Sequence, residues 1–308
     1  MQDAVVKRLF ATCFIDTHVI LDSLFVSFLL LGFAVLVIRP LDCVIRLLLL
    51  LRYPSMASHH ARFDALIDTV KEVSSFVLSH FLDPNFTKRV KVDGSIVTSI
   101  DCKAEEMAKE LILSRFPDDS ILGEEYGTVD GSTTYQWVID PIDGTASFAR
   151  GVPLFGTQIG LQYSGEPVAG AIDLPATGDF ISAIVGEGAF HNDKRCIMSE
   201  RSKLKQLMVS TTSYEYYQQT QSTELHKALV ESGVSMRGYS DCFGFMLLCT
   251  GRIDAVVEPL LHPWDIIPWL PIIREAGGNF SRIAKGGFAS NQKVHGLLYD
   301  VLNANITN

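Results

Sequence analysis

The pattern of the chain changes near Lys203, and this change constrains the fold more than any other feature of the sequence. Before it, two amphipathic helical patterns are followed by a run of strand-like segments. After it, strand-like and helix-like segments alternate. A run of strands favours an antiparallel sheet with helices packed on it, whereas alternation favours an α/β arrangement. The sequence therefore predicts an α+β half that packs against an α/β half.

The expected elements follow from hydrophobic periodicity and turn residues. One helix begins near Phe63 and ends before Pro84, and a second is expected over residues 103–116. Strands are expected at residues 137–139, 157–163, 168–173, 180–185, 208–211 and 255–258, and further helices at 224–232, 242–250 and 266–276. We expect three parts: an extension over residues 1–56, the α+β half over 57–204 and the α/β half over 205–308.

The extension is the most apolar part of the chain. Residues 19–38 form an apolar run of 20 residues, which is long enough to span a bilayer as a helix, although Asp22 interrupts it. Arg39, Arg46 and Arg52 follow this run and favour a cytoplasmic position for the rest of the chain. Two alternatives stay open: the run tethers the protein to a membrane, or the working protein starts at Met56 and residues 1–55 do not belong to it.

Composition excludes several classes of protein. A net charge of −9 argues against a nucleic-acid partner, whose binding surface would be basic. The six cysteines form no Cys-x-x-Cys pair and no Cys/His ligand spacing, so a disulfide scaffold and a zinc finger are excluded. A reducing compartment is expected, and we predict a cytoplasmic protein.

The chemistry is concentrated in a turn after the strand at residues 137–139, which reads Asp140-Pro141-Ile142-Asp143-Gly144-Thr145. Two carboxylates three residues apart on a tight turn repel each other unless a counter-charge is present. Mg²⁺ is the natural counter-charge because it prefers oxygen ligands and few protein carboxylates. Asp-Pro and Asp-Gly are also common turn formers, so this motif alone does not decide the matter.

Three other acidic positions support the metal hypothesis. Glu124 follows an expected strand, Asp265 begins an expected helix, and Asp101 stands just before another helix, where its ordinary role would be an N-cap. Together with Gly186-x-Gly188-Ala189-Phe190 and Glu275-Ala276-Gly277-Gly278, these motifs resemble the inositol monophosphatase family of Mg²⁺-dependent phosphatases over residues 62–308.

The resemblance implies a fold, a cofactor and a set of roles. The fold is a layered αβαβα sandwich, the cofactor is two or three Mg²⁺ ions, and the assembly is a homodimer. Glu124, Asp140, the Ile142 carbonyl, Asp143 and Asp265 would be metal ligands, Asp101 and Thr145 would orient and deprotonate the attacking water, and the Gly144 and Thr145 N–H groups would bind phosphate.

The substrate is expected to be a small phosphate monoester. Glu258 matches the family position that contacts a substrate hydroxyl, and Asp241 adds a second carboxylate near the leaving group. A carboxylate there favours a cationic alcohol, so we predict a histidinol-phosphate phosphatase of histidine biosynthesis. An inositol monophosphatase or a broad small-molecule phosphatase is the near alternative, and a membrane-tethered scaffold without turnover is a remote one. Asp241 has an equal alternative as the N-cap of the helix at residues 242–250.

Overall fold

The computed structural model describes residues 56–92, 94–239 and 241–304. The chain divides into two compact units, residues 1–59 and residues 60–308. The first unit contributes only the start of helix α2 (Met56–Ser79) to the described residues, and the apolar run at residues 19–38 lies outside them. In the described part of the chain, no helix is both long enough and apolar enough to cross a membrane.

The second unit contains a large sheet of eight strands in the order β10-β9-β8-β7-β6-β5-β3-β4. Its neighbours pair antiparallel, except for β3 and β5, which run parallel. The strands are β3 (Ser120–Gly123), β4 (Gly127–Val129), β5 (Tyr135–Asp143), β6 (Gly156–Tyr163), β7 (Glu166–Leu174), β8 (Asp179–Ile184), β9 (Gly188–His191) and β10 (Lys194–Arg195). The run of strands expected from the sequence is therefore this sheet.

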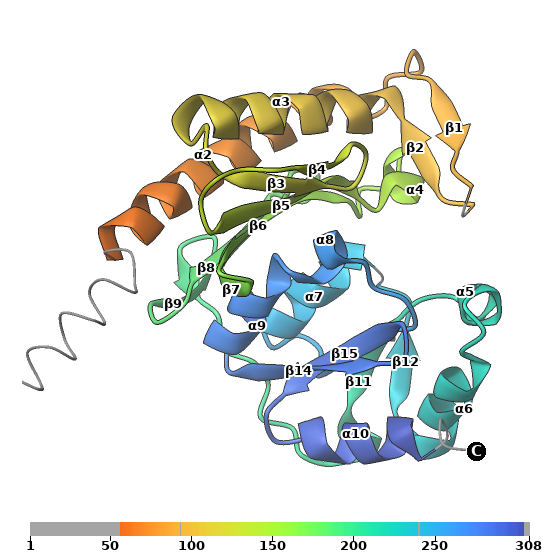
Figure 1. The fold of residues 1–308 in the computed structure, drawn as a ribbon. Coiled ribbons are helices and arrows are strands. Elements are labelled where there is room, and N and C mark those ends of the chain that lie inside the picture. The colour runs from red at the N-terminus through yellow and green to blue at the C-terminus, as the bar shows by residue number, and fades with distance from the viewer. Residues whose placement is uncertain (1–55, 93, 240, 305–308) are drawn as a thin grey trace, which may run out of the picture. The chain divides into compact units, whose positions relative to one another are not determined.

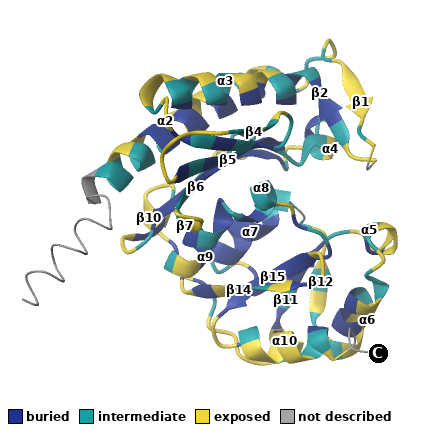
Figure 2. Cartoon of the chain, in the orientation of Figure 1, coloured by how far each residue is buried: buried dark blue, intermediate teal, exposed yellow. Residues whose placement is uncertain are grey.

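Helices α2 and α3 (Ser99–Arg115) cover one face of the eight-stranded sheet (Figure 1). Their apolar sides form a buried core with β5 and β6, as the dark blue faces in Figure 2 show. Arg62 of α2 ties this layer to the sheet, because its guanidinium pairs with the Asp119 carboxylate at 2.8 Å. A hairpin of β1 (Lys88–Val90) and β2 (Ile96–Thr98) joins the two helices, and the short helix α4 (Thr145–Phe148) follows β5.

The second sheet has five strands in the order β12-β11-β13-β15-β14. Strand β11 (Met208–Thr211) pairs parallel with both β12 (Ser235–Arg237) and β13 (Ala255–Glu258). The hairpin of β14 (Gly278–Ile283) and β15 (Gly286–Asn291) completes the sheet in antiparallel pairing. A single turn of 3₁₀ helix, Leu204–Gln206, precedes β11.

Two groups of helices complete the layers. Helices α7 (Asp241–Cys249), α8 (Pro263–Ile266) and α9 (Trp269–Glu275) lie between the two sheets in Figure 1, and α7 and α9 contact both of them. Helices α5 (Tyr214–Gln219), α6 (Thr223–Ser232) and α10 (His295–Asn303) lie on the other side of the five-stranded sheet, where α6 and α10 close a separate core. The predicted αβαβα order of layers is confirmed.

Two expected helices differ from the observed ones. The helix expected over residues 266–276 is divided into α8 and α9, because Pro268 interrupts the hydrogen-bond ladder between them. The helix expected over residues 103–116 begins four residues earlier, at Ser99, because Thr98 caps it. Both corrections concern segments that carry the acidic residues.

Candidate active site

An irregularity in β5 places its two aspartates together. Asp140 pairs with Gln158 of β6 and Asp143 pairs with Gly156, so β5 holds one extra residue between these pairs. Residues three apart on a regular strand point to opposite faces, and the extra residue of a β-bulge restores them to one face. The hydroxyl of Thr157 donates to the Pro141 carbonyl at 2.8 Å and holds the bulge.

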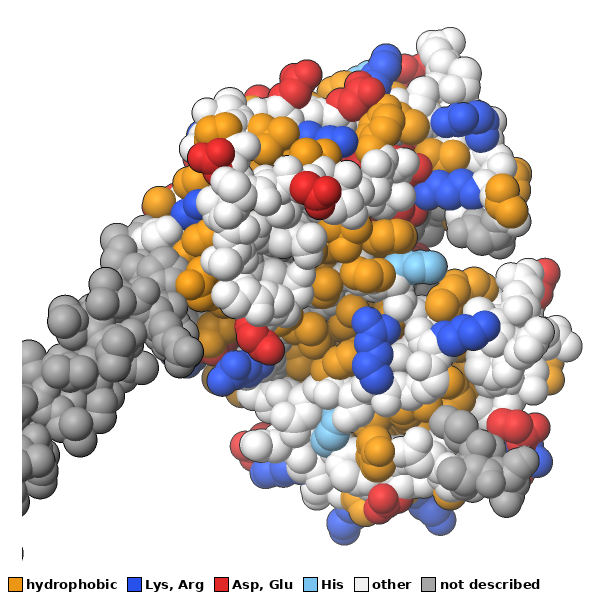
Figure 3. Space-filling view, viewed as in Figure 1, with side chains coloured by type: hydrophobic (Ala, Val, Ile, Leu, Met, Phe, Trp, Pro, Cys, Tyr) orange, Lys and Arg blue, Asp and Glu red, His pale blue; other side chains and the backbone are white. Residues whose placement is uncertain are grey.

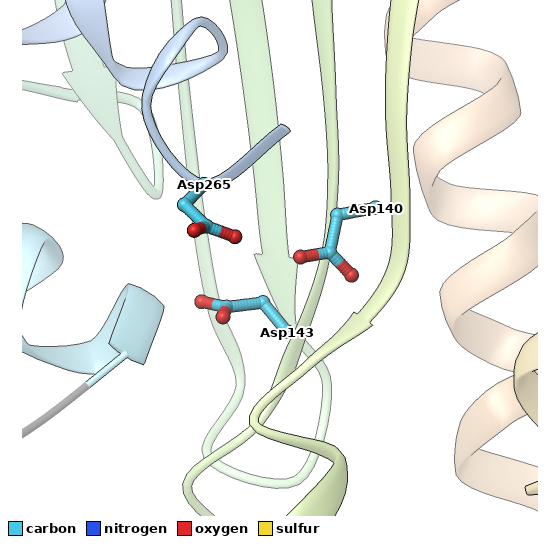
Figure 4. A group of neighbouring side chains, drawn as sticks. All are labelled: Asp140, Asp143 and Asp265. Atoms are coloured by element: carbon cyan, nitrogen blue, oxygen red, sulfur yellow. The ribbon is translucent and has the colours of Figure 1, made fainter. Parts of the chain in front are cut away.

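Asp265 completes a cluster with these two residues. One carboxylate oxygen from each of Asp140, Asp143 and Asp265 lies within 4.8 Å of the others, and the three side chains point toward one another in Figure 4. Asp265 comes from α8, where its Oδ2 accepts from the His262 N–H at 2.6 Å. Asp143 accepts a hydrogen bond from the Cys242 N–H at the start of α7. Two helices of the middle layer, α7 and α8, therefore fix acidic side chains of the site.

The electrostatics of the cluster favour a positive partner. Burial, followed by the charges of Glu124, Asp143 and Asp265, raises the pKa of Asp140 well above its usual value. Burial and the charges of Asp241 and Asp265 do the same to the pKa of Asp143. Burial is also the main reason why the pKa of Asp265 rises to about 7. Such mutual repulsion is removed by a bound cation.

Glu124 lies in the turn after β3, outside the group of three aspartates. Lys91 donates to Oε1 of Glu124 and to Oε1 of Glu125, both at 2.8 Å. Burial alone would lower the pKa of Lys91, but these hydrogen bonds outweigh it and raise that pKa. The same side chains line a pocket with Arg89 and Val97, and Figure 3 shows the surface hollowed below the β1–β2 hairpin.

Glu105 supports the turn that contains Glu124 by accepting hydrogen bonds from the backbone of that turn, and the sequence analysis did not identify Glu105. This fully buried carboxylate accepts from the backbone N–H of Glu125 at 2.7 Å and from that of Tyr126 at 3.1 Å. A Cβ at Gly123 would lie 2.0 Å from its Oε1, so only glycine fits there. The sequence signal that could have identified Glu105 is its position four residues after Asp101, which places the carboxylates of both residues on one face of α3.

Asp101 and Thr145 are joined by a hydrogen bond, and Asp101 is not the N-cap of α3. Thr98 caps α3, and Asp101 occupies the N3 position of a capping box in which its Oδ2 accepts from the Thr98 N–H at 2.8 Å. Its other oxygen, Oδ1, accepts from the Thr145 hydroxyl at 2.9 Å. That hydroxyl also lies 2.9 Å from the Ile142 carbonyl oxygen. Burial, which the Thr98 and Thr145 bonds only partly offset, raises the pKa of Asp101.

Gly144 forms the turn between β5 and α4. Its φ of +85° lies in the left-handed region, which glycine adopts without strain. A Cβ would lie 2.8 Å from the Leu154 carbonyl oxygen and 3.4 Å from Oδ2 of Asp241. The predicted phosphate-binding turn thus lies directly beside the Asp241 carboxylate.

Asp241 and Glu258 approach the cluster from the second sheet and its helix. Asp241 is the first residue of α7 and has a φ of +60°. Glu258 ends β13, and its buried Oε1 finds no hydrogen-bond donor in the described part of the chain. Burial and the charges of Asp241, Asp143 and Asp265 raise the pKa of Glu258. Asp241 and Glu258 therefore interact electrostatically with the carboxylates of Asp143 and Asp265.

This donor set fits divalent cations. It consists of oxygen atoms alone, it concentrates negative charge, and Oδ1 of Asp140 is buried with no hydrogen-bond partner among the described residues. Hard cations such as Mg²⁺ bind such oxygens at the end of a strand. The layered αβαβα fold thus carries, on a bulged strand, a carboxylate cluster that can hold divalent cations.

Comparison with known proteins identifies the family. The model of the inositol monophosphatase family matches residues 60–305. A histidinol-phosphatase of Chlorobaculum parvum is 34% identical over 213 residues, which cover 69% of this chain and 82% of that protein. An inositol-1-monophosphatase of Mesorhizobium japonicum is 34% identical over 207 residues, covering 66% of this chain and 77% of that protein. The IMPase structure of Thermotoga maritima superposes with a TM-score of 0.72 at 29% identity, covering 80% of this chain and 98% of that one.

The chain belongs to the inositol monophosphatase family. It is a hydrolase of phosphate monoesters, and its family is metal-dependent. The scaffold alternative, in which the fold has no turnover, is therefore set aside.

Proposed function

We propose that this protein is a Mg²⁺-dependent histidinol-phosphate phosphatase that acts in histidine biosynthesis. The observation that carries the proposal is the pair of carboxylates beside the phosphate turn. Asp241 lies against Gly144, and the Glu258 carboxylate, whose buried Oε1 has no hydrogen-bond partner among the described residues, interacts electrostatically with Asp241. Histidinol phosphate carries an ammonium group that such carboxylates would bind, whereas inositol phosphate offers only neutral hydroxyls.

Asp140, Asp143, Asp265, Glu124 and the Ile142 carbonyl would hold two or three Mg²⁺ ions. When bound, these ions lower the pKa of a coordinated water and neutralise phosphate oxygens. Gly144 and Thr145 would bind the phosphate through their backbone N–H groups, with the left-handed φ of Gly144 setting the turn.

The proton transfer is assigned to Thr145 and Asp101. The Thr145 hydroxyl lies 2.9 Å from Oδ1 of Asp101, so it can accept a proton from the attacking water while it passes its own to that oxygen. Burial makes Asp101 a better base than a surface aspartate because it raises its pKa. The products are histidinol and inorganic phosphate.

Substrate selection is tested with Asp241→Asn. Asparagine tolerates the left-handed φ of this position, so the substitution removes the charge without adding backbone strain. Loss of a charged hydrogen bond predicts a fall in kcat/KM for histidinol phosphate of about 10- to 100-fold. For inositol 1-phosphate we expect a change below about twofold, because no charged bond is lost.

The matched control is Asp193→Asn. Asp193 has a φ of +63° in the β9–β10 hairpin, at the edge of the sheet remote from β5. It should leave both kcat/KM values unchanged. A wild-type preference for inositol 1-phosphate, or equal losses for both substrates in Asp241→Asn, would support the inositol monophosphatase alternative, which the Mesorhizobium relative favours.

The remaining parts of the proposal concern assembly and location. We propose a homodimer in the cytoplasm, in which residues 19–38 are the segment available for membrane contact. Light scattering of the purified chain and fractionation of cells that express it with and without residues 1–55 test these two expectations.

A further inference from the structure

A fully buried glutamine lies next to the acidic cluster and contacts it. Gln158 of β6 has no exposed surface, and its Nε2 donates to Oδ2 of Asp140 at 3.2 Å. Its Oε1 accepts from the indole Nε1 of Trp269 at 2.8 Å. Trp269 begins α9 and is also fully buried. The three side chains therefore form a buried chain of hydrogen bonds from β5 to the middle helix layer.

This chain fixes which way the glutamine amide faces. An indole N–H can only donate, so the carbonyl of Gln158 must face Trp269 and its NH₂ must face Asp140. The amide therefore occupies one oxygen of Asp140, while the other, Oδ1, receives no hydrogen bond from any described residue. A neutral donor orients the carboxylate without cancelling its charge, which stays available for a cation.

The same bond anchors the segment that carries Asp265. Only Ile267 and Pro268 separate α8 from α9. Pro268 lies against the sheet: a Cβ at Gly160 would be 2.9 Å from its nitrogen, and a Cβ at Gly170 would be 1.9 Å from its carbonyl oxygen. The backbone of the junction thus lies in close contact with β6 and β7. The Trp269 indole adds a hydrogen bond to Gln158 of β6.

We propose that Gln158 and Trp269 are positioning residues that hold Asp140 and the Asp265 segment at the spacing a divalent cation needs. This inference rests on the proposed metal site. Partners of metal-binding carboxylates raise metal affinity because they keep the ligands in the bound geometry before the ion arrives. Loss of such a partner weakens metal binding by about 10- to 100-fold in other sites.

The test measures Mn²⁺ binding to the full chain by isothermal titration calorimetry without substrate, together with thermal unfolding. Gln158→Met removes both polar groups at similar size, and Trp269→Phe removes only the indole donor and part of the ring. We expect a dissociation constant at least about 10-fold higher for Gln158→Met and about threefold higher for Trp269→Phe.

Trp137→Phe is the matched control. Trp137 is also fully buried, and its Nε1 donates to a carboxylate, Asp119, at 3.0 Å, but that carboxylate is not part of the cluster. This variant should lower the melting temperature as Trp269→Phe does and leave Mn²⁺ binding within about twofold of the wild type. A structural role alone would make the two tryptophan variants alike in both measurements.

Asp140→Asn distinguishes a failure of the positioning role from a failure of the proposed metal site. If Asp140→Asn binds Mn²⁺ like the wild type, the proposed metal site is wrong. If Asp140→Asn fails to bind while Gln158→Met and Trp269→Phe bind like the wild type, the site stands and the positioning role is wrong. If Gln158→Met does not fold, the comparison of Trp269→Phe with Trp137→Phe decides the question.

Discussion

Replacing Glu105 tests whether a buried carboxylate outside the cluster holds the Glu124 turn in place. In Glu105→Ala, the N–H groups of Glu125 and Tyr126 lose their acceptor. Each unsatisfied, partly buried donor costs about 1–3 kcal/mol. Part of this loss is offset because the variant no longer buries a carboxylate, whose burial raises the pKa of Glu105. The net loss in the free energy of unfolding is therefore about 2–4 kcal/mol.

Glu105→Gln gives a graded version of the same perturbation. Its carbonyl oxygen replaces one carboxylate oxygen, but its NH₂ group faces the other N–H, so one of the two bonds is lost. We expect a loss of about 1–2 kcal/mol, measured by urea unfolding with and without Mg²⁺. The Mg²⁺ concentration for half-maximal activity should rise in the same order, because Glu124 moves with its turn.

Glu106→Gln is the control for Glu105. Glu106 is the next residue of α3, is exposed, and bonds only the Tyr126 hydroxyl in the described structure. Its substitution should change stability by less than about 0.5 kcal/mol and leave the Mg²⁺ dependence unchanged. If Glu105→Ala matched Glu106→Gln in both measurements, the reasoning about the turn would be wrong.

Three further predictions follow from the site. Gly123→Ala should destabilise the chain by about 1–3 kcal/mol in denaturant unfolding, since its Cβ would meet the Glu105 carboxylate, whereas Gly296→Ala in open space on α10 should not. The metal-free protein should lose thermal stability as the pH rises through about 7. Burial raises the pKa of Asp265 in the folded state to about 7, whereas an aspartate in the unfolded chain ionises near pH 4. A melting temperature in EDTA that rises between about pH 5.5 and pH 7.5 would contradict this prediction. Asp101→Asn should lower kcat by about 10²- to 10⁴-fold at saturating Mg²⁺ with little change in melting temperature, and an unchanged kcat would exclude it as the base.

Sequence reasoning predicted much of this site because its motifs are local. Asp140 and Asp143 stand three residues apart in one motif, and the strand before them and the glycine after them are visible in the sequence. The expected turn over these residues was wrong, because both lie within β5, which extends to Asp143. The bulge that turns both side chains to one face is not visible, because it depends on the register between β5 and β6. Asp101 shows the same limit: the helix start was expected four residues late, so Thr98 was missed as the cap.

Contacts between distant segments account for what the sequence did not predict. Gln158 and Trp269 are 111 residues apart, and nothing in either local pattern indicates their hydrogen bond. The break at Pro268 was also missed, because the apolar spacing continues across it while the close contact with Gly170 forms only in the folded chain. Lys91 and Glu105 were missed for the same reason, since the residues that they hold lie in the Glu124 turn.

The most direct test of the central claim, that the acidic cluster binds the ions needed for phosphate release, is a Mg²⁺ titration of the EDTA-treated full chain with histidinol phosphate as substrate. Wild-type protein should release no phosphate in EDTA and regain activity as Mg²⁺ is added. Asp140→Asn should stay folded, by circular dichroism, and inactive at every Mg²⁺ concentration. Phosphate release in EDTA, or wild-type kcat/KM in Asp140→Asn, would contradict the account.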